Sequence, residues 1–264
     1  MSAPTVTAMD VPGISRPVLV VLIVAAVLLF AYGAGTAVGR ITRHTDTQTR
    51  TLAAVPTVVV TSRNADVNVV ASDRRDVRVT TREQRSVWGG GHVDLRGDAG
   101  GLQLRDSCRD IPVVDDPCHV SMRLDVPRST SVRVVTGTGD LRAEHLAGSA
   151  DLRSGTGDLH VLGVRGPVRA HADTGDVEVV APAPDISVRT ATGDVAIVAS
   201  HPQTIHAEAA TGDVILVVPD LTYAVDAQSD VGDDKVFVHV DDASPRKLEA
   251  HTNTGDVIVS SDAP

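Results

Sequence analysis

The chain has 264 residues, of which 42% are hydrophobic and only 2% aromatic, and its formal net charge is -10 at pH 7. This composition excludes a disordered chain and favours a core of Val, Ala, Leu and Ile in thin, regular β-layers. The negative charge and the scattered basic residues argue against a nucleic-acid partner, which needs clustered Lys and Arg.

An uncharged apolar segment lies near the N-terminus. It runs from Val18 to Val38, between Arg16 and Arg40. About 20 apolar residues are enough to cross the hydrocarbon core of a bilayer. We therefore predict a short N-terminal tail over residues 1–16, a transmembrane helix over 17–39 and contact with the lipid bilayer through 18–38. A cleaved signal peptide is the alternative, because residues 34–37 are small enough for a cleavage site.

The orientation of this span depends on two opposing signals. Arg40, Arg43 and Arg50 follow the span, which by the positive-inside rule favours a cytoplasmic C-terminal domain. Cys108 and Cys118 stand ten residues apart, a spacing that can close a disulfide loop in an oxidising compartment, although two unpaired thiols remain the alternative. We predict a single-pass protein of the cell membrane with an extracellular C-terminal domain.

The segment after the span divides into a tether and a β-rich region. Residues 40–54 are rich in Thr and Arg and are interpreted as the tether. Residues 55–135 contain short alternating runs typical of degenerate β-strands, and Asn64-Ala65-Asp66 resembles a worn turn of the repeat described below. Because the terminal units of a repeat array are atypical, this region is predicted to cap a solenoid over residues 136–264.

A Thr-Gly-Asp tripeptide recurs through the second half of the chain, with one Val-Gly-Asp variant at Val231. Its Gly-Asp pairs are Gly139-Asp140, Gly157-Asp158, Gly175-Asp176, Gly193-Asp194, Gly212-Asp213, Gly232-Asp233 and Gly255-Asp256, with glycine spacings of 18, 18, 18, 19, 20 and 23 residues. A period near 18 means that each unit must stack on its neighbours to bury its apolar face. The sequence therefore predicts an all-β fold: a single-stranded parallel β-solenoid, or β-helix, with an N-terminal β cap after one transmembrane α-helix.

Within each unit, two runs of alternating apolar and polar residues predict two half-buried strands. The side chains predicted to point inward are Leu152, Leu159, Val161, Val168, Ala170, Val177, Val179, Ile186, Val188, Val195, Ile197, Ile205, Ala207, Val214 and Leu216. Arg153, Arg169, Arg189 and Glu208 are then expected to face solvent.

The Gly-Asp pairs are predicted to be structural turn residues. Gly supplies a positive φ, and Asp bonds nearby backbone N–H groups. The alternative is a calcium site, because aspartates on stacked turns form a ladder of like charges, but the several glycines per repeat of calcium β-rolls are missing. We predict no metal and no cofactor.

Catalytic patterns are weak in this sequence. Outside the span the only aromatic residues are Trp88, Tyr223 and Phe237, too scattered for the sugar-stacking platform of a polysaccharide-cleaving β-helix. The ten histidines show no metal-ligand spacing, and the glycines after Trp88 lack the Lys and helix of a phosphate loop. We predict that the protein is not an enzyme.

The Gly-Asp-Val/Leu turns that follow degenerate β-strands, as in Thr174–Val177 and Thr192–Val195, resemble a bacterial "putative adhesin" family of unknown function over roughly residues 55–262. The repeats are also distantly similar to bactofilin-type β-helices. The resemblance implies a cell-envelope setting and carries no binding residues.

Three hypotheses of function follow. The leading one is a membrane-anchored, non-enzymatic cell-envelope solenoid whose outer strands bind an unknown envelope protein or surface ligand. The alternatives are an envelope-stress sensing or regulatory protein and a self-assembling scaffold, since solenoid ends can pair strand to strand. Asp262 and Pro264, at the end of the chain, are expected to discourage such self-association.

Overall fold

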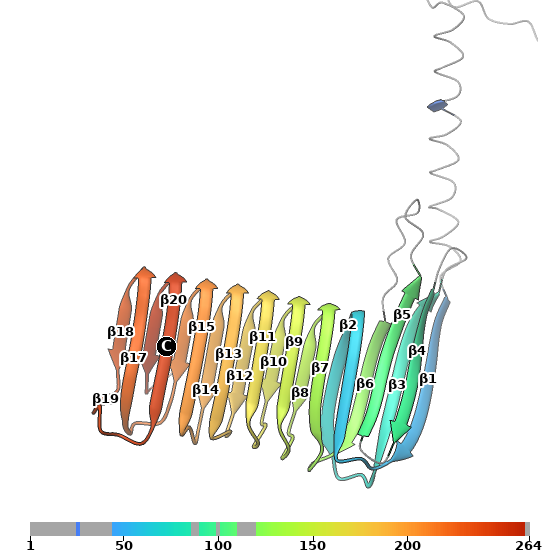
Figure 1. The fold of residues 1–264 in the computed structure, drawn as a ribbon, viewed down its shortest axis with the longest axis horizontal. Helices are drawn as coiled ribbons and strands as arrows, with labels where there is room; N and C mark the ends of the chain where they lie inside the picture. Colours follow the sequence, from blue (N-terminus) through green and yellow to red (C-terminus); the bar gives the residue numbers. More distant parts are fainter. Residues whose placement is uncertain (1–24, 27–43, 86–89, 99–100, 110–119, 262–264) are drawn as a thin grey trace, which may run out of the picture.

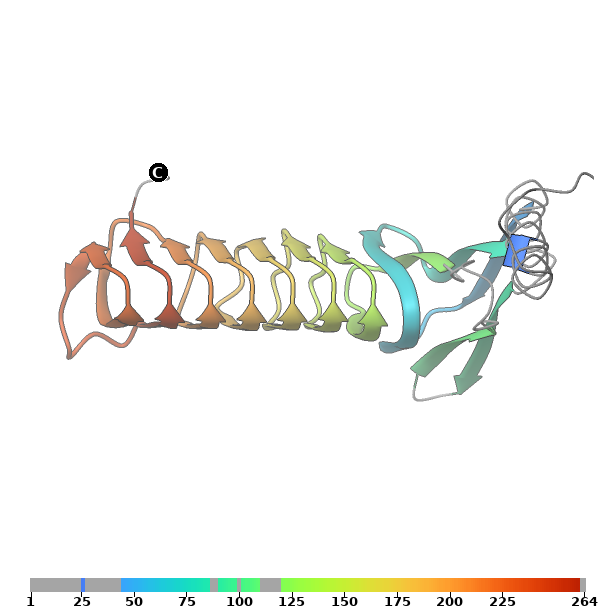
Figure 2. The ribbon, with the colours of Figure 1, turned by 90° about the horizontal axis from the view of Figure 1, so that it is seen from above.

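The computed structural model describes residues 25–26, 44–85, 90–98, 101–109 and 120–261. Two parallel ladders of strands face each other and form a narrow rod (Figures 1 and 2). Within the described part of the chain, no helix is long and apolar enough to cross a bilayer. The predicted span over residues 18–38 lies outside the described residues except at 25–26, so it stays a prediction.

The two ladders share strand β2 and otherwise use separate strands. Ladder 1 contains, in spatial order, β5 (Gly101–Arg109), the first half of β2 (Thr57–Ser72), β7 (Ser131–Thr138), β9 (Ala150–Thr156), β11 (Val168–Thr174), β13 (Asp185–Thr192), β15 (Thr204–Thr211), β20 (Lys247–Thr254) and β17 (Thr222–Val231). Ladder 2 contains β6 (Val120–Pro127), the second half of β2, β8 (Leu141–Glu144), β10 (Leu159–Leu162), β12 (Val177–Ala181), β14 (Val195–Ala199), β16 (Val214–Val217), β21 (Val257–Ser260) and β18 (Asp234–Phe237).

The predicted parallel solenoid is confirmed, and so is its inward set. Each of the 15 predicted inward side chains is buried, and Val, Ala, Leu and Ile supply nearly all of the core. Because both inner faces carry aliphatic residues in register, the side chains form continuous apolar rows along the rod.

Antiparallel strands extend both ladders at the N-terminal end of the rod. Strand β4 (Gly90–Asp98) pairs with β5, β3 (Asp76–Arg85) pairs with β6, and β1 (His44–Ala53) pairs with β3. Strand β1 corrects the prediction that residues 40–54 are only a tether. Thr45, Thr47, Thr49 and Thr51 alternate as β-branched residues do in strands, a pattern that the polar composition of the segment masks.

Strand order departs from chain order at both ends. Strand β2 lies between β5–β6 and β7–β8, and it sets Asn64 beside Thr138 as the worn turn. At the other end, β20 and β21 lie between β15–β16 and β17–β18 (Figure 1). The last coil in the sequence is therefore interior, and the Val231-Gly232-Asp233 coil is the end of the rod. Asp262 and Pro264 lie outside the described residues, so the expectation that they discourage self-association stays a prediction.

Candidate functional site

The turn glycines form one column along the rod. Their φ values lie between 134° and 154°. A Cβ at any of them would come closer than 3.0 Å to a backbone carbonyl oxygen of the adjacent coil, usually that of its turn glycine. Glycine is thus required both by the backbone conformation and by the approach of the next coil.

The turn aspartates form a second column and bond one another. The carboxylate Oδ1 of each Asp accepts the backbone N–H of the Asp in the next coil, from Asp66 through Asp140 to Asp256 and Asp233, at 2.8–3.1 Å. Among the described residues, no three His, Cys, Asp or Glu side chains are grouped to hold a metal. The ladder therefore has a structural explanation, and calcium binding stays untested.

Buried hydroxyl groups complete the turns from inside. Ser154 Oγ donates to the Gly139 carbonyl oxygen at 3.2 Å, and Thr190 Oγ1 donates to that of Gly175 at 3.1 Å. Ala172 occupies the equivalent position opposite Gly157 and offers no hydroxyl group. Most polar groups of the Gly-Asp turns are thus hydrogen-bonded within the protein, and the turns have a structural role.

The outer face of ladder 1 carries a basic hollow, which we name the arginine groove. It has a volume of about 310 Å³ and is lined by Asp151, Arg153, Arg169, Ala170, His171, Ser187 and Arg189. These residues belong to β9, β11 and β13, where strand alternation directs all of these side chains outward except that of Ala170, which is buried. Arg153, His171 and Arg189 occupy one column on three successive coils.

Positive charge exceeds negative charge in the arginine groove. Asp151 pairs with Arg153 at 3.3 Å and with Arg133, outside the groove, at 3.6 Å, while Arg189 reaches Glu208 at 2.9 Å. Arg169 pairs with no carboxylate in the described part of the chain. Three guanidinium groups therefore face one lining carboxylate.

The next coils of ladder 1 have a different character. His206 Nδ1 lies 2.9 Å from Glu249 Oε2, and its Nε2 lies 3.5 Å from Glu208 Oε2. His251 lies 3.7 Å from Asp226. The basic stretch thus ends at β13, and paired histidines and carboxylates follow it.

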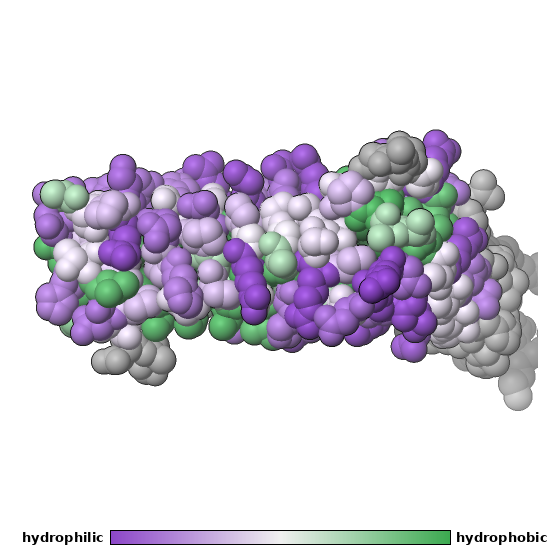
Figure 3. Space-filling view, turned by 90° about the horizontal axis from the view of Figure 1, so that it is seen from below, coloured by the Kyte–Doolittle hydropathy of each residue, from purple (hydrophilic) through white to green (hydrophobic). Residues whose placement is uncertain are grey.

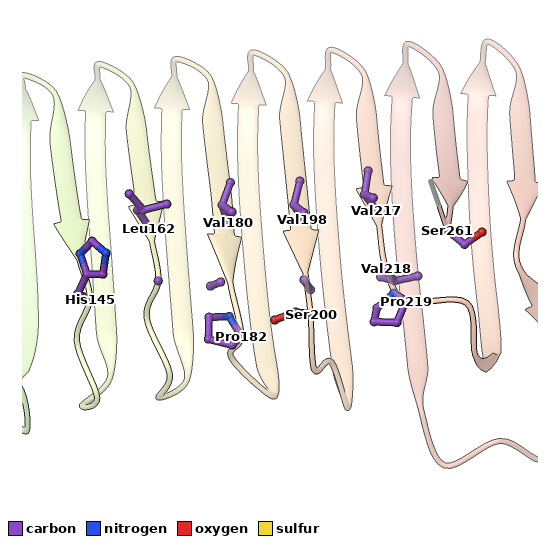
Figure 4. Close-up of a pocket in the computed structure, with 13 residues that line it drawn as sticks. His145, Leu162, Val180, Pro182, Val198, Ser200, Val217, Val218, Pro219 and Ser261 are labelled. Carbon is purple, nitrogen blue, oxygen red and sulfur yellow. The ribbon is translucent and has the colours of Figure 1, made fainter. Parts of the chain in front are cut away.

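Ladder 2 carries an apolar groove at the C-terminal ends of its strands, beside the loops that follow them. It has a volume of about 410 Å³, and its outward side chains Leu162, Val180, Val198 and Val217 stand in a row on four coils (Figure 4). Seen from below, apolar residues gather along the lower border of the rod (Figure 3).

Sequence reasoning missed this row although it had a signal. Each of these strands carries two consecutive apolar residues, as in Val161-Leu162 and Ile197-Val198, which breaks the alternation of a strand with one solvated face.

Other predicted residues are placed as follows. Arg153, Arg169 and Arg189 are exposed as expected, and Glu208 is half-buried. Tyr223 is buried and donates its hydroxyl proton to the Pro219 carbonyl oxygen at 3.0 Å; burial raises the pKa of its phenol. Cys118, Trp88 and the side chain of Cys108 lie outside the described residues, so the disulfide stays a prediction.

The turn residues of this solenoid bond one another, and grooves lie on the outer faces of its two ladders. These features place it in the class of repeat proteins that present extended surfaces. A family model described as Toastrack DUF4097 matches residues 119–262, more than half of the chain. The chain belongs to this family.

Two solved structures are similar to this chain at low sequence identity, and the first of them shows the same fold. A "putative adhesin" from Bacteroides fragilis NCTC 9343 is 11% identical with a TM-score of 0.50, covering 82% of this chain and 97% of that one. A "putative cell adhesion protein" from Clostridium sporogenes ATCC 15579 is 10% identical with a TM-score of 0.42, covering 82% and 99%. No curated protein sequence matches the chain. The family and the fold agree with the predicted resemblance, while the likeness to bactofilins stays an expectation.

Proposed function

We propose that this chain is a non-enzymatic, adhesin-like binding module of the cell envelope, and that its arginine groove binds an anionic surface ligand. The supporting observation is the excess of guanidinium groups over carboxylates in the groove, on the outer face of a chain whose net charge is -10. Arg169 is the diagonal neighbour of both Arg153 and Arg189 on the adjacent strands, and the repulsion between these like charges is an electrostatic cost. A bound oxyanion removes this cost.

The geometry of the groove suits a linear ligand. Arg153 and Arg189 are two coils apart in one column, which corresponds to about 10 Å along the rod. Guanidinium groups bind carboxylates and phosphates through paired N–H donors. A chain-like ligand with an oxyanion every 5 to 10 Å or so would therefore meet successive arginines as it follows the rod.

The non-enzymatic part of the proposal rests on how the other groups are used. The turn carboxylates accept backbone N–H groups, and Tyr223 is buried rather than available as a sugar platform. Membrane attachment through residues 18–38 with an external solenoid is supported by the uncharged run and by the cysteine pair.

Binding can be tested with the full chain in detergent micelles. The probes are fluorescently labelled linear polyphosphate and poly-glutamate, titrated at low and high salt to separate phosphate from carboxylate recognition. We expect Arg169→Ala to weaken binding about tenfold, equivalent to about 1.4 kcal/mol, and salt to weaken it further. Arg165→Ala is the matched control, since Arg165 is exposed in the loop before β11 and lies outside the groove. Equal losses in the two variants would show that the groove is not the site.

Orientation needs a separate measurement. Intact cells are treated with a membrane-impermeant thiol reagent before and after reduction. Labelling of Cys108 and Cys118 that appears only after reduction supports an external, disulfide-bearing domain. Labelling that waits for cell lysis would place the solenoid in the cytoplasm.

A further inference from the structure

The end of the rod opposite β1 is unusually apolar. Of the six exposed large hydrophobic residues in the described chain, five lie on the last coil or its flanking loops: Leu221, Val231, Val236, Phe237 and Val240. Val231 is 66% exposed and Phe237 64%. Terminal units of repeat proteins normally turn polar faces to water, and a gathered apolar surface indicates an interaction site.

The same end leaves strand edges open. Strand β17 pairs with β20 over Ala224–Val231, and its other side is paired only at Thr222 and Tyr223, by β19 (His239–Val240). Strand β18 pairs with β21 alone. In the described chain no strand covers the outer edge of β17 beyond Tyr223 or that of β18. One backbone group of β17 is engaged, because the Ser229 N–H donates to Asp234 Oδ1 at 2.8 Å, and a second strand would have to replace this bond.

We propose that this end binds the same end of a second copy of the chain, giving a closed dimer of two rods joined end to end. An occupant must pair with two strand edges that are about 10 Å apart, and must continue the apolar row between them. Another solenoid end has both properties. The N-terminal end is built differently, because its outermost strands, β1 and β4, run antiparallel to β3 and β5 and do not continue the parallel stacking.

A two-fold axis across the rod makes the contact self-complementary. It sets β17 antiparallel to β17 of the second copy and β18 antiparallel to its counterpart. A register centred on Ala227 places Asp226 beside Gln228 of the partner subunit and Asp230 beside the partner's Ala224. No two carboxylates of β17 then face each other. Each copy has one such end, so assembly stops at two.

The contact is small for a stable complex. A two-stranded end offers less than the roughly 800 Å² per partner of standard interfaces, so we expect reversible association. Confinement of both copies to one membrane, where that attachment exists, raises their effective concentration and favours the dimer.

Sedimentation velocity of the full chain in detergent micelles, over a rising protein concentration, tests the proposal. We expect a monomer–dimer equilibrium with nothing larger. The double variant Phe237→Lys/Val240→Lys should weaken dimerisation at least tenfold, because charges replace exposed apolar side chains. The matched control Val198→Lys changes the sixth exposed apolar residue, in the apolar groove far from the end, and should leave the equilibrium unchanged.

The geometry of the contact has its own test. A photocrosslinking residue at Gln228 should give a covalent dimer, and the same residue at Arg142, in the middle of the rod, should not. A monomer at all concentrations, a dimer that survives Phe237→Lys/Val240→Lys, or growth into longer polymers would each overturn the proposal. None of these results bears on ligand binding by the arginine groove.

Discussion

Replacing one turn glycine should destabilise the whole rod. Gly193 has φ 138° and lies between Gly175 and Gly212 in the glycine column. In Gly193→Ala the new Cβ would lie closer than 3.0 Å to both the oxygen and the carbon of the Gly175 carbonyl. Backbone strain costs about 1–3 kcal/mol and the forced separation of two coils about 1–3 kcal/mol more. We expect a loss of about 2–6 kcal/mol in the free energy of unfolding.

Urea denaturation followed by circular dichroism measures this loss. Ala191→Ser is the control, since Ala191 is exposed on the same strand as Thr192 and lies outside the glycine column. The control should change the free energy of unfolding by less than about 0.5 kcal/mol. If Gly193→Ala were as mild as the control, the close approach of coils at the turns would be refuted.

Three further predictions concern side-chain hydrogen bonds, and the third also concerns the titration of the Tyr223 phenol. Asp176→Asn should keep most of the stability, because an amide oxygen still accepts the next coil's N–H, whereas Asp176→Ala should lose about 1 kcal/mol. Ala172→Ser should add about 0.5–1.5 kcal/mol by supplying a donor to the Gly157 carbonyl oxygen. Tyr223→Phe should lose about 1 kcal/mol with its bond to Pro219. Because burial raises the phenol pKa above its unfolded value of 10.0, the wild type should lose stability as the pH rises above 10.0, and Tyr223→Phe should lack this loss.

The same denaturation assay checks all three. Equal losses in the Asn and Ala variants at position 176 would contradict the carboxylate-to-backbone bond. A destabilised Ala172→Ser would mean that the position has no room for a hydroxyl group. An unchanged alkaline loss in Tyr223→Phe would show that another group titrates.

The stacking of coils was predictable from the sequence because both strand alternation and the turn period are local patterns. Residues such as Val177 and Val179 repeat every 18 or 19 positions, so their burial follows from one coil to the next. Spatial order at the ends was not predictable in this way. The 23-residue spacing before Gly255 and the Val231 variant mark an unusual coil, but they do not say that β20 inserts between β15 and β17.

The candidate site was predictable only in part. Alternation placed Arg153, Arg169 and Arg189 outside, but their grouping depends on register between strands 18 residues apart. Which arginine lacks a carboxylate depends on side-chain contacts such as Arg189 with Glu208. The repeat pattern of the sequence does not predict which side chains form such ion pairs.

Binding to the cell envelope tests the central claim most directly. The full chain in detergent micelles is titrated with an envelope fraction of its own source, comparing the wild type with Arg153→Glu/Arg169→Glu and with Val198→Lys. The proposal predicts that charge reversal in the arginine groove lowers the affinity more than tenfold, while Val198→Lys on ladder 2 leaves it unchanged. Binding that survives charge reversal, or that falls only with Val198→Lys, would contradict the assignment of the arginine groove as the binding surface.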